Sequence, residues 1–179
     1  MTRLLVLGML DIQPMSGYDI QQSLKMTDAE RWGGVLIGSI YHAIKKLEQE
    51  GHVEITSIEQ TGNRQKAIYK ITDSGKKHLK DLVREALMAS SVFYPSTLYS
   101  VLSFFNKLAL EETKHALEQQ LSTLNNEYAA VKQGYEAKVS VMQNSIPPMV
   151  KLIFDNMFAI IHQQQDFVEK ALELLITQE

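Results

Sequence analysis

The sequence predicts a mainly α-helical protein with one small β-hairpin, in which a mixed N-terminal domain precedes a wholly helical C-terminal domain. Helical periodicity recurs through most of the 179 residues, and an alternating apolar–polar pattern appears only between residues 53 and 71. Heptad-like spacing of large apolar residues then fills much of the second half. Serines and a proline at 90–96 interrupt the pattern, which places the domains at 1–90 and 91–179.

Composition restricts the class of protein. The chain is 45% hydrophobic and 22% charged, as folded domains are, and it has no cysteine for disulfides or thiolate metal sites. The apolar start is too short for a signal peptide, and no run reaches the ~20 apolar residues of a membrane span, so we expect a cytoplasmic protein. Residues 1–80 hold 11 Lys/Arg against 9 Asp/Glu, whereas residues 81–179 hold 7 against 12. This asymmetry suits a small nucleic-acid-binding head on a non-binding body.

The first helices are short. Residues 3–10 predict an almost wholly apolar helix that Pro14 ends. Ser16 is a good N-cap for a second helix reaching about Lys25, and a loop is expected over residues 30–34. That loop contains Trp32, the only tryptophan, which is either a packed anchor or a ligand platform.

Residues 37–51 predict the helix around which the first domain is organised. Ile37, Ile40, Ile44 and Leu47 form one apolar stripe, and Gly51 can end the helix in the left-handed conformation. The candidate DNA-contacting residues at or near its first turns are Gly38, Ser39, Tyr41, His42 and Lys45. Hydroxyl, imidazole and ammonium groups can meet phosphates and base edges, although an ordinary solvated helix face has the same composition.

A hairpin follows this helix. Residues 53–58 and 67–71 predict two strands, and the polar tip between them contains Arg64 and Lys66. Helices followed by a hairpin with a basic tip form a winged helix-turn-helix, in which the third helix enters the major groove and the wing contacts backbone or minor groove. Arg64 and Lys66 are therefore interpreted as phosphate contacts, the alternative being solvated turn residues.

The remainder is helical. Thr72 caps a helix to about Ser90, Ser96 is expected to cap a short apolar helix, and two long helices cover about 110–142 and 149–176. Their apolar surface exceeds what one chain can cover, which predicts a homodimer. The predicted dimerisation residues are Leu117, Leu121, Leu124, Tyr128, Val131, Tyr135, Val150, Ile153, Met157 and Ile161.

Several motifs together resemble the PadR family of bacterial transcriptional regulators. They are Ser16–Asp19, Gly38–Tyr41, Leu47, Gly51, Tyr69 and Thr72–Gly75. The long helical tail is similar in layout to the larger PadR subgroup. His42 and Ile44 depart from the family, which often has proline and leucine there.

The resemblance implies a homodimeric repressor with a winged-helix domain and a C-terminal helical dimerisation domain. Such a dimer binds a pseudo-palindromic operator on double-stranded DNA and is released by a small aromatic or amphipathic effector, phenolic acids being one possibility for the class. We expect the effector near Tyr18, Trp32, Phe93 and Tyr94, where the two domains adjoin.

The sequence argues against an enzyme and leaves one other class of protein open. An enzyme is not expected, because the sequence has no Gly-rich phosphate loop, nucleophile elbow or cysteine nucleophile. The five histidines stand apart in sequence with no pair at helical ligand spacing, so no metal or cofactor is expected. A winged-helix dimer that binds proteins instead of DNA is the alternative, and the salt dependence of DNA binding separates the two.

Overall fold

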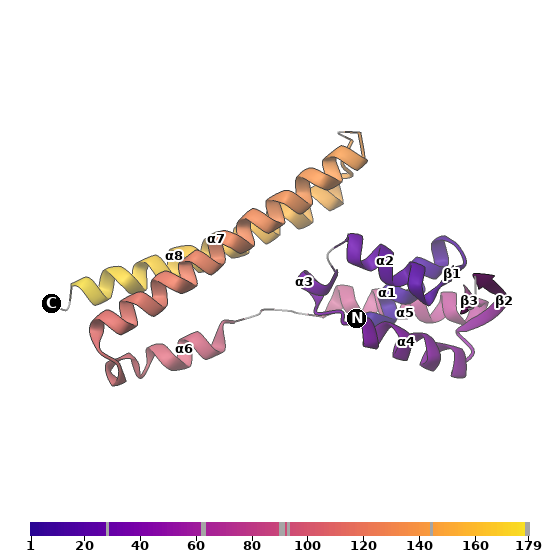
Figure 1. The fold of residues 1–179 in the computed structure, drawn as a ribbon, viewed down its shortest axis with the longest axis horizontal. Coiled ribbons are helices and arrows are strands. Elements are labelled where there is room, and N and C mark those ends of the chain that lie inside the picture. Colours follow the sequence, from indigo (N-terminus) through magenta and orange to yellow (C-terminus); the bar gives the residue numbers. More distant parts are fainter. Residues whose placement is uncertain (28, 62–63, 90–91, 93, 144, 178–179) are drawn as a thin grey trace. The chain divides into compact units, whose positions relative to one another are not determined.

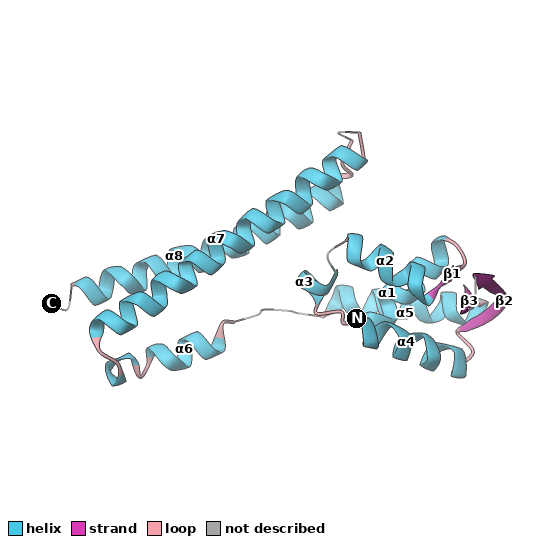
Figure 2. Cartoon of the chain, in the orientation of Figure 1, coloured by secondary structure: helices cyan, strands magenta, loops and turns pink. Residues whose placement is uncertain are grey.

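The computed structural model confirms a mainly helical chain with one small antiparallel sheet (Figures 1 and 2). It describes residues 1–179 apart from 28, 62–63, 90–91, 93, 144 and 178–179, and the side chains of Thr61, Arg64 and Phe105 are also outside the description. The chain divides into two compact units, Met1–Val92 and Phe93–Glu179. Within the described residues, no helix combines the length and the apolar character that crossing a membrane requires.

The first unit contains helices and a three-stranded sheet. Its elements are α1 (Thr2–Ile12), β1 (Met15–Ser16), α2 (Gly17–Met26), α3 (Ala29–Gly33), α4 (Ile37–Gln49), β2 (Val53–Thr61), β3 (Arg64–Ile71) and α5 (Asp73–Met88). The strand order is β1-β3-β2, and all neighbours are antiparallel. The strand β1 was not predicted, because two residues after a proline show no alternation. The loop expected at residues 30–34 is wrong in part, since Ala29–Gly33 form the short helix α3.

The core of this unit lies between α1, α2, α4 and the sheet. Its buried side chains are Val6, Leu7, Leu10, Ile20, Leu24, Ala29, Val35, Ile40, Ala43, Ile44, Leu47, Val53 and Ile71. Full burial of each large aliphatic side chain contributes roughly 1.5–3 kcal/mol. The stripe predicted on α4 is confirmed at Ile40, Ile44 and Leu47, but Ile37 is half exposed because the first turn of α4 extends beyond the core.

Three predicted helix ends are confirmed. The Ser16 hydroxyl accepts a hydrogen bond from the Asp19 amide, and the Asp19 carboxylate accepts one from the Ser16 amide, which is a capping box at the start of α2. Gly51 follows α4 with φ +74°, a conformation that favours glycine. The Thr72 hydroxyl accepts from the Gly75 amide at the start of α5. These contacts fix the bounds of the helices on both sides of the sheet.

The second unit is wholly helical in its described part. It contains α6 (Ser96–Leu102), the short 3₁₀ helix η1 (Phe105–Lys107), α7 (Leu110–Val141) and α8 (Pro148–Ile176). The long helices α7 and α8 lie side by side and antiparallel (Figure 1). Proline occupies the first position of α8, as expected. The expected Ser96 cap is wrong: Pro95 is the N-cap residue of α6, and no side chain caps this helix.

The predicted seam of α7 packs on α8 of the same chain. Leu117 is buried against Val168 and Leu175, with Leu121 and Leu124 beside them. Further along, rings of α7 and α8 meet: Tyr128 contacts Phe158 and His162, and Tyr135 contacts Phe154 and Phe158, with centroids 5.0–6.4 Å apart. The seam residues of α7 therefore have a partner within the same chain, and dimerisation through them stays a prediction.

The helix α8 also has a second apolar stripe. Ile153, Ile160, Phe167 and Leu174 recur every seven residues, and Tyr99 of α6 covers the Phe167 ring edge-on at 5.4 Å. Ile153, Ile160 and Leu174 are 50%, 55% and 64% exposed. Of the residues predicted for dimerisation on α8, Ile161 is buried and Val150 and Met157 are partly buried, so Ile153 is the exposed one.

Candidate nucleic-acid interface

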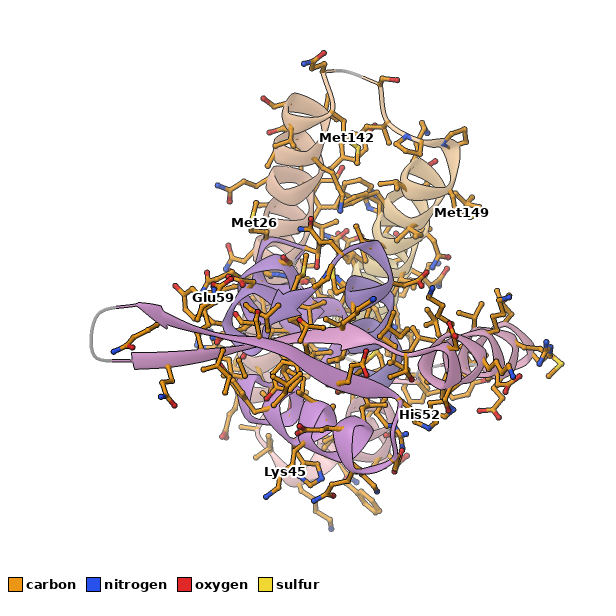
Figure 3. The ribbon with its side chains drawn as sticks, turned by 90° about the vertical axis from the view of Figure 1, so that its right-hand side faces the viewer. Met26, Lys45, His52, Glu59, Met142 and Met149 are labelled. Carbon is orange, nitrogen blue, oxygen red and sulfur yellow. The ribbon has the colours of Figure 1, made fainter. Side chains whose placement is uncertain are left out.

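The helix α4 separates a buried side from an exposed polar side. Ile40, Ile44 and Leu47 fix it to the core, while Gly38, Tyr41, His42 and Lys45 are exposed at i, i+3, i+4 and i+7. Lys45 projects away from the body of the unit (Figure 3). Five of the seven predicted DNA contacts thus belong to one helix, and four of them share one exposed face.

Ser39, the remaining predicted contact on α4, is only partly exposed. Its hydroxyl donates to the Leu36 carbonyl at 2.6 Å and lies 3.4 Å from the Thr2 hydroxyl of α1. Leu36 is the N-cap residue and supplies no side-chain cap. The Ser39 proton is therefore used at the helix start, and its oxygen can act toward a ligand only as an acceptor.

Tyr41 is braced by the start of α2. A Cβ placed on Gly17 would lie 2.8 Å from Tyr41 Cε1, so the ring rests directly on the glycine backbone. The capping box at Ser16 and Asp19 fixes that backbone. Gly17 in the Ser16–Asp19 motif is therefore a packing requirement, because any larger residue would displace the Tyr41 ring.

Lys66 lies in an ion pair instead of standing free on the wing. Its Nζ is 2.9 Å from Asp19 Oδ2 and 3.2 Å from Oδ1. The Lys66 hydrogen bond, followed by those from Ser16, lowers the pKa of Asp19, and the same contact raises the pKa of Lys66. Ser16 pairs with Ile68, so the unpredicted strand β1 brings β3 beside the start of α2. The Lys66 ammonium group thus joins the wing to α2, and its predicted contact with a DNA phosphate stays a prediction.

The other wing residue is only partly described. Arg64 begins β3, paired with Thr61, but its side chain lies outside the described residues. On the adjoining strand, Glu59 is the register partner of Lys66 and appears on the wing in Figure 3. The wing thus carries charges of both signs.

Two histidines that are distant in sequence form a stacked pair. The rings of His52, at the start of β2, and His78, on α5, are 4.4 Å apart and nearly parallel. Arg3 of α1 donates to His78 Nε2 at 3.1 Å and pairs with Glu50 at the end of α4. Burial, followed by His78, lowers the pKa of His52. Histidines that stand apart in the sequence thus meet in the fold, although no group of three potential ligands among the described residues could hold a metal ion.

The predicted effector residues belong to separate units. Tyr18 on α2 and Trp32 on α3 are exposed in the first unit, where the Trp32 indole donates to the Thr27 carbonyl at 2.8 Å. Tyr94 in the second unit is exposed, with its ring 6.3 Å from that of Tyr99, and Phe93 lies outside the described residues. An effector site formed by these residues stays a prediction.

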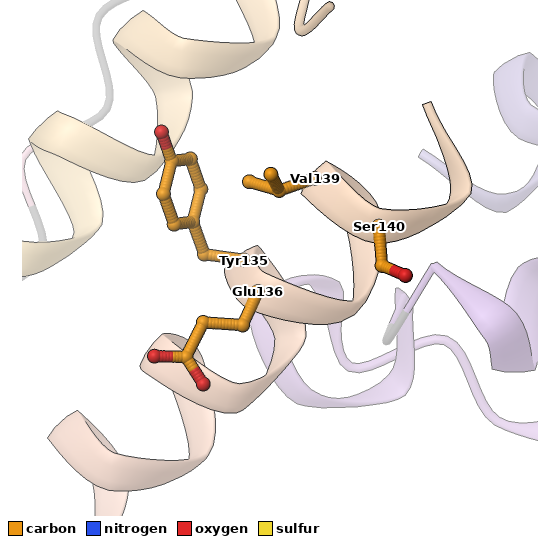
Figure 4. Close-up of a pocket in the computed structure, with 4 residues that line it drawn as sticks. All are labelled: Tyr135, Glu136, Val139 and Ser140. Atoms are coloured by element: carbon orange, nitrogen blue, oxygen red, sulfur yellow. The ribbon is translucent and has the colours of Figure 1, made fainter. Parts of the chain in front are cut away.

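Two open hollows occur on the second unit. The larger, about 500 Å³, is lined by Tyr135, Glu136, Val139 and Ser140 near the end of α7 (Figure 4). The other, about 380 Å³, lies at the opposite end of the helix pair, beside Lys170 and Leu174. Among the described effector candidates, Tyr18, Trp32 and Tyr94 do not line either hollow.

The chain matches known proteins along its length. Residues 6–81 match the model of the transcriptional regulator PadR-like family. The negative transcriptional regulator PadR of Bacillus subtilis (strain 168) is 29% identical over 132 residues, which cover 73% of this chain and 71% of that protein. The crystal structure of Bacillus subtilis PadR in complex with operator DNA aligns with a TM-score of 0.74 and 24% identity over 97% of this chain and 98% of that one.

A second structure of the same relative shows it with a small molecule. Bacillus subtilis PadR in complex with p-coumaric acid aligns with a TM-score of 0.73 and 23% identity over 97% of each chain. These likenesses show a common fold over both units, including the winged-helix arrangement. The relatives are transcriptional regulators and not enzymes. The chain is therefore similar to the PadR-like family of transcriptional regulators over residues 6–81, and its whole length shares the fold of Bacillus subtilis PadR.

Proposed function

We propose that this protein is a homodimeric transcriptional repressor in which α4 reads the bases of a pseudo-palindromic operator. The exposed face of α4, with Gly38, Tyr41, His42 and Lys45 opposite a buried apolar stripe, is the observation that supports this best. The operator complex of a relative with the same fold supports it independently. Arg64 is proposed as the phosphate contact of the wing, with Lys66 holding the wing against α2.

A glycine substitution on α4 separates DNA binding from folding. A Cβ added at Gly38 meets nothing within 4 Å, so Gly38→Ala leaves the fold intact and gains up to about 1 kcal/mol of helix propensity. The added methyl group nevertheless stands where DNA backbone or bases must approach closely. We expect weaker operator binding with an unchanged or higher melting temperature.

Gly8 on α1 offers the matched control. A Cβ there also meets nothing within 4 Å, and Gly8→Ala is likewise a glycine-to-alanine change in a helix. Its operator affinity should equal that of the parent. If the Gly38→Ala variant binds the operator as tightly as the parent, measured by fluorescence anisotropy, α4 does not contact DNA.

The salt dependence of DNA binding tests the protein-binding alternative. A salt-independent affinity would favour that alternative, because phosphate contacts make log affinity fall with log salt.

The proposed dimer uses the second stripe of α8. Ile153, Ile160 and Leu174 are exposed on one side of a helix whose other side packs on α7, and water disfavours such a contiguous apolar row. A second copy of the chain presents the same stripe and can cover it symmetrically. We expect Ile160→Asp to dissociate the dimer, whereas Ala159→Asp, at an exposed position of the same helix about 100° round from Ile160, should not. Light scattering that finds the parent protein monomeric at micromolar concentration excludes the dimer.

A small-molecule effector completes the proposal. The p-coumaric acid complex of the relative supports an aromatic or amphipathic ligand class, and Tyr18, Trp32, Phe93 and Tyr94 are the proposed contacts. A ligand shifts the equilibrium between a DNA-binding and a released conformation only as far as its affinities for the two conformations differ. Titration with phenolic acids should quench Trp32 emission in step with operator release, while the dimer mass stays constant. Absence of release by any compound refutes this part.

A further inference from the structure

The first turns of α4 expose apolar surface that the core does not use. Leu36, Ile37 and Tyr41 are 61%, 49% and 47% exposed within six consecutive residues. Scattered exposed apolar residues are normal, but this group occupies the end of the helix that enters the groove in the proposed function. The folded head alone gives no reason for three large apolar side chains at that place.

Ile37 and Tyr41 lie on the same side of the helix. They are four residues apart, so their side chains are neighbours one turn from each other. The next residue in that row is Lys45, which is exposed and charged. Along this edge, the helix therefore presents two apolar groups followed by one cation.

The Tyr41 ring is held in place. It rests on the Gly17 backbone, which leaves no room even for a methyl group on that glycine. The capping box of α2 fixes Gly17 in turn. A braced ring loses little conformational freedom on binding, so an apolar contact made by its exposed half is not offset by an ordering cost.

The partner of an apolar group in the major groove follows from the chemistry of the bases. Hydrogen-bond donors and acceptors dominate the edges there, and the 5-methyl group of thymine is the apolar exception. Phosphates and the remaining base atoms would leave Ile37 and the Tyr41 ring without a complementary surface.

We infer that Ile37 and Tyr41 read thymine 5-methyl groups in each operator half-site. This inference rests on the proposed function, because it assumes that α4 enters the major groove. It goes beyond the proposed function by naming thymine as the base that Ile37 and Tyr41 recognise. It also makes Ile37, which the sequence pattern had assigned to the core, a residue that determines sequence specificity. Each contacted methyl group should contribute about fourfold to affinity, which corresponds to ~0.8 kcal/mol for burying one methyl-sized group.

The test removes methyl groups from DNA one at a time. Each thymine of the operator is replaced by uracil, which differs only by the 5-methyl group, and affinity is measured by anisotropy. Wild-type protein should lose about fourfold at one or two thymines per half-site. Ile37→Ala and Tyr41→Ala should bind the parent operator more weakly and each should lose its sensitivity to uracil at its own position. Tyr41→Phe keeps the ring and should keep the sensitivity, and Leu87→Ala, an exposed leucine on α5, should behave as wild type.

The outcomes distinguish this inference from the proposed function. If no thymine is sensitive to uracil while Gly38→Ala still weakens operator binding, α4 binds DNA without reading methyl groups, and the inference is overturned. If the sensitivity persists unchanged in both alanine variants, other residues read the methyl groups, which also overturns it. If the wild-type protein shows no sequence preference at all, both the proposed function and the inference fall.

Discussion

Gly75→Ala should destabilise the first unit by forcing α5 away from the start of β2. A Cβ at Gly75 would lie 2.0 Å from the His52 carbonyl oxygen and 2.7 Å from Ile71 Cγ1. Since such contacts are not shorter than 3.0 Å, the backbones must separate by about 1 Å. That carbonyl also accepts the Thr72 amide at 3.1 Å, and Thr72 donates its hydroxyl proton to the Gly51 carbonyl at 2.8 Å. The displacement therefore strains the junction of α4, β2 and α5 at once.

The magnitude follows from three contributions. Overpacking costs about 1–3 kcal/mol, and a lost backbone hydrogen bond costs about 1 kcal/mol more, while alanine regains up to about 1 kcal/mol of helix propensity. The net loss of about 1–3 kcal/mol lowers the melting temperature of a domain of this size by roughly 4–20 °C.

Trp32, the only tryptophan, lies in this unit, so its fluorescence reports thermal unfolding of the unit. Gly8→Ala is the control, because its open surroundings predict an unchanged or slightly higher melting temperature. A Gly75→Ala variant as stable as the parent would refute the close packing of α5 on His52.

Further predictions concern the pH dependence, the wing and the second unit. Burial lowers the pKa of His52 below 6.5, so as the pH falls the unfolded chain takes up this proton before the folded chain does. The free energy of unfolding of the first unit should therefore be highest above pH 6.5 and decline below it. His52→Gln should flatten that decline, measured by urea titration at several pH values. Asp19→Asn keeps an acceptor for the Ser16 amide but weakens the pair with Lys66. Amide hydrogen exchange along β3 should therefore accelerate while the helix content stays constant. Unchanged exchange would mean that the pair does not hold the wing. Leu117→Ala should cost about 2–5 kcal/mol in the second unit, measured by circular dichroism, and should leave the Trp32 transition of the first unit in place.

Local signals in the sequence predicted much of the first unit. Serine, glycine and threonine at the helix ends gave the bounds of three helices, because caps depend on residues that are adjacent in the chain. The periodicity of α4 gave its buried side, except at Ile37, where exposure depends on how far the core extends. An apolar residue at the start of a recognition helix fits both the core and a ligand, so its spacing alone does not decide between them.

Contacts between distant residues were missed for a physical reason. The pair of Lys66 with Asp19 requires β1 to lie beside β3, and β1 has only two residues. The stack of His52 on His78 requires α5 to pack at the start of β2, where Gly75 allows the close approach. Gly75 belongs to the recognised Thr72–Gly75 motif, so the signal for this packing was present, but nothing in the motif indicates which element it contacts.

The spacing of an apolar seam does not say which helix covers it. That depends on how many apolar stripes each helix of the chain has. The seam of α7 repeats with a spacing of four and three, which a helix of the same chain or of a second chain satisfies equally well. In the structure, α8 satisfies it. The helix α8 has two stripes, however, and α7 can cover only one of them. The residues of the second stripe, Ile153, Ile160 and Leu174, thus form a row that α7 leaves exposed, and a homodimer should form there before it forms at the seam.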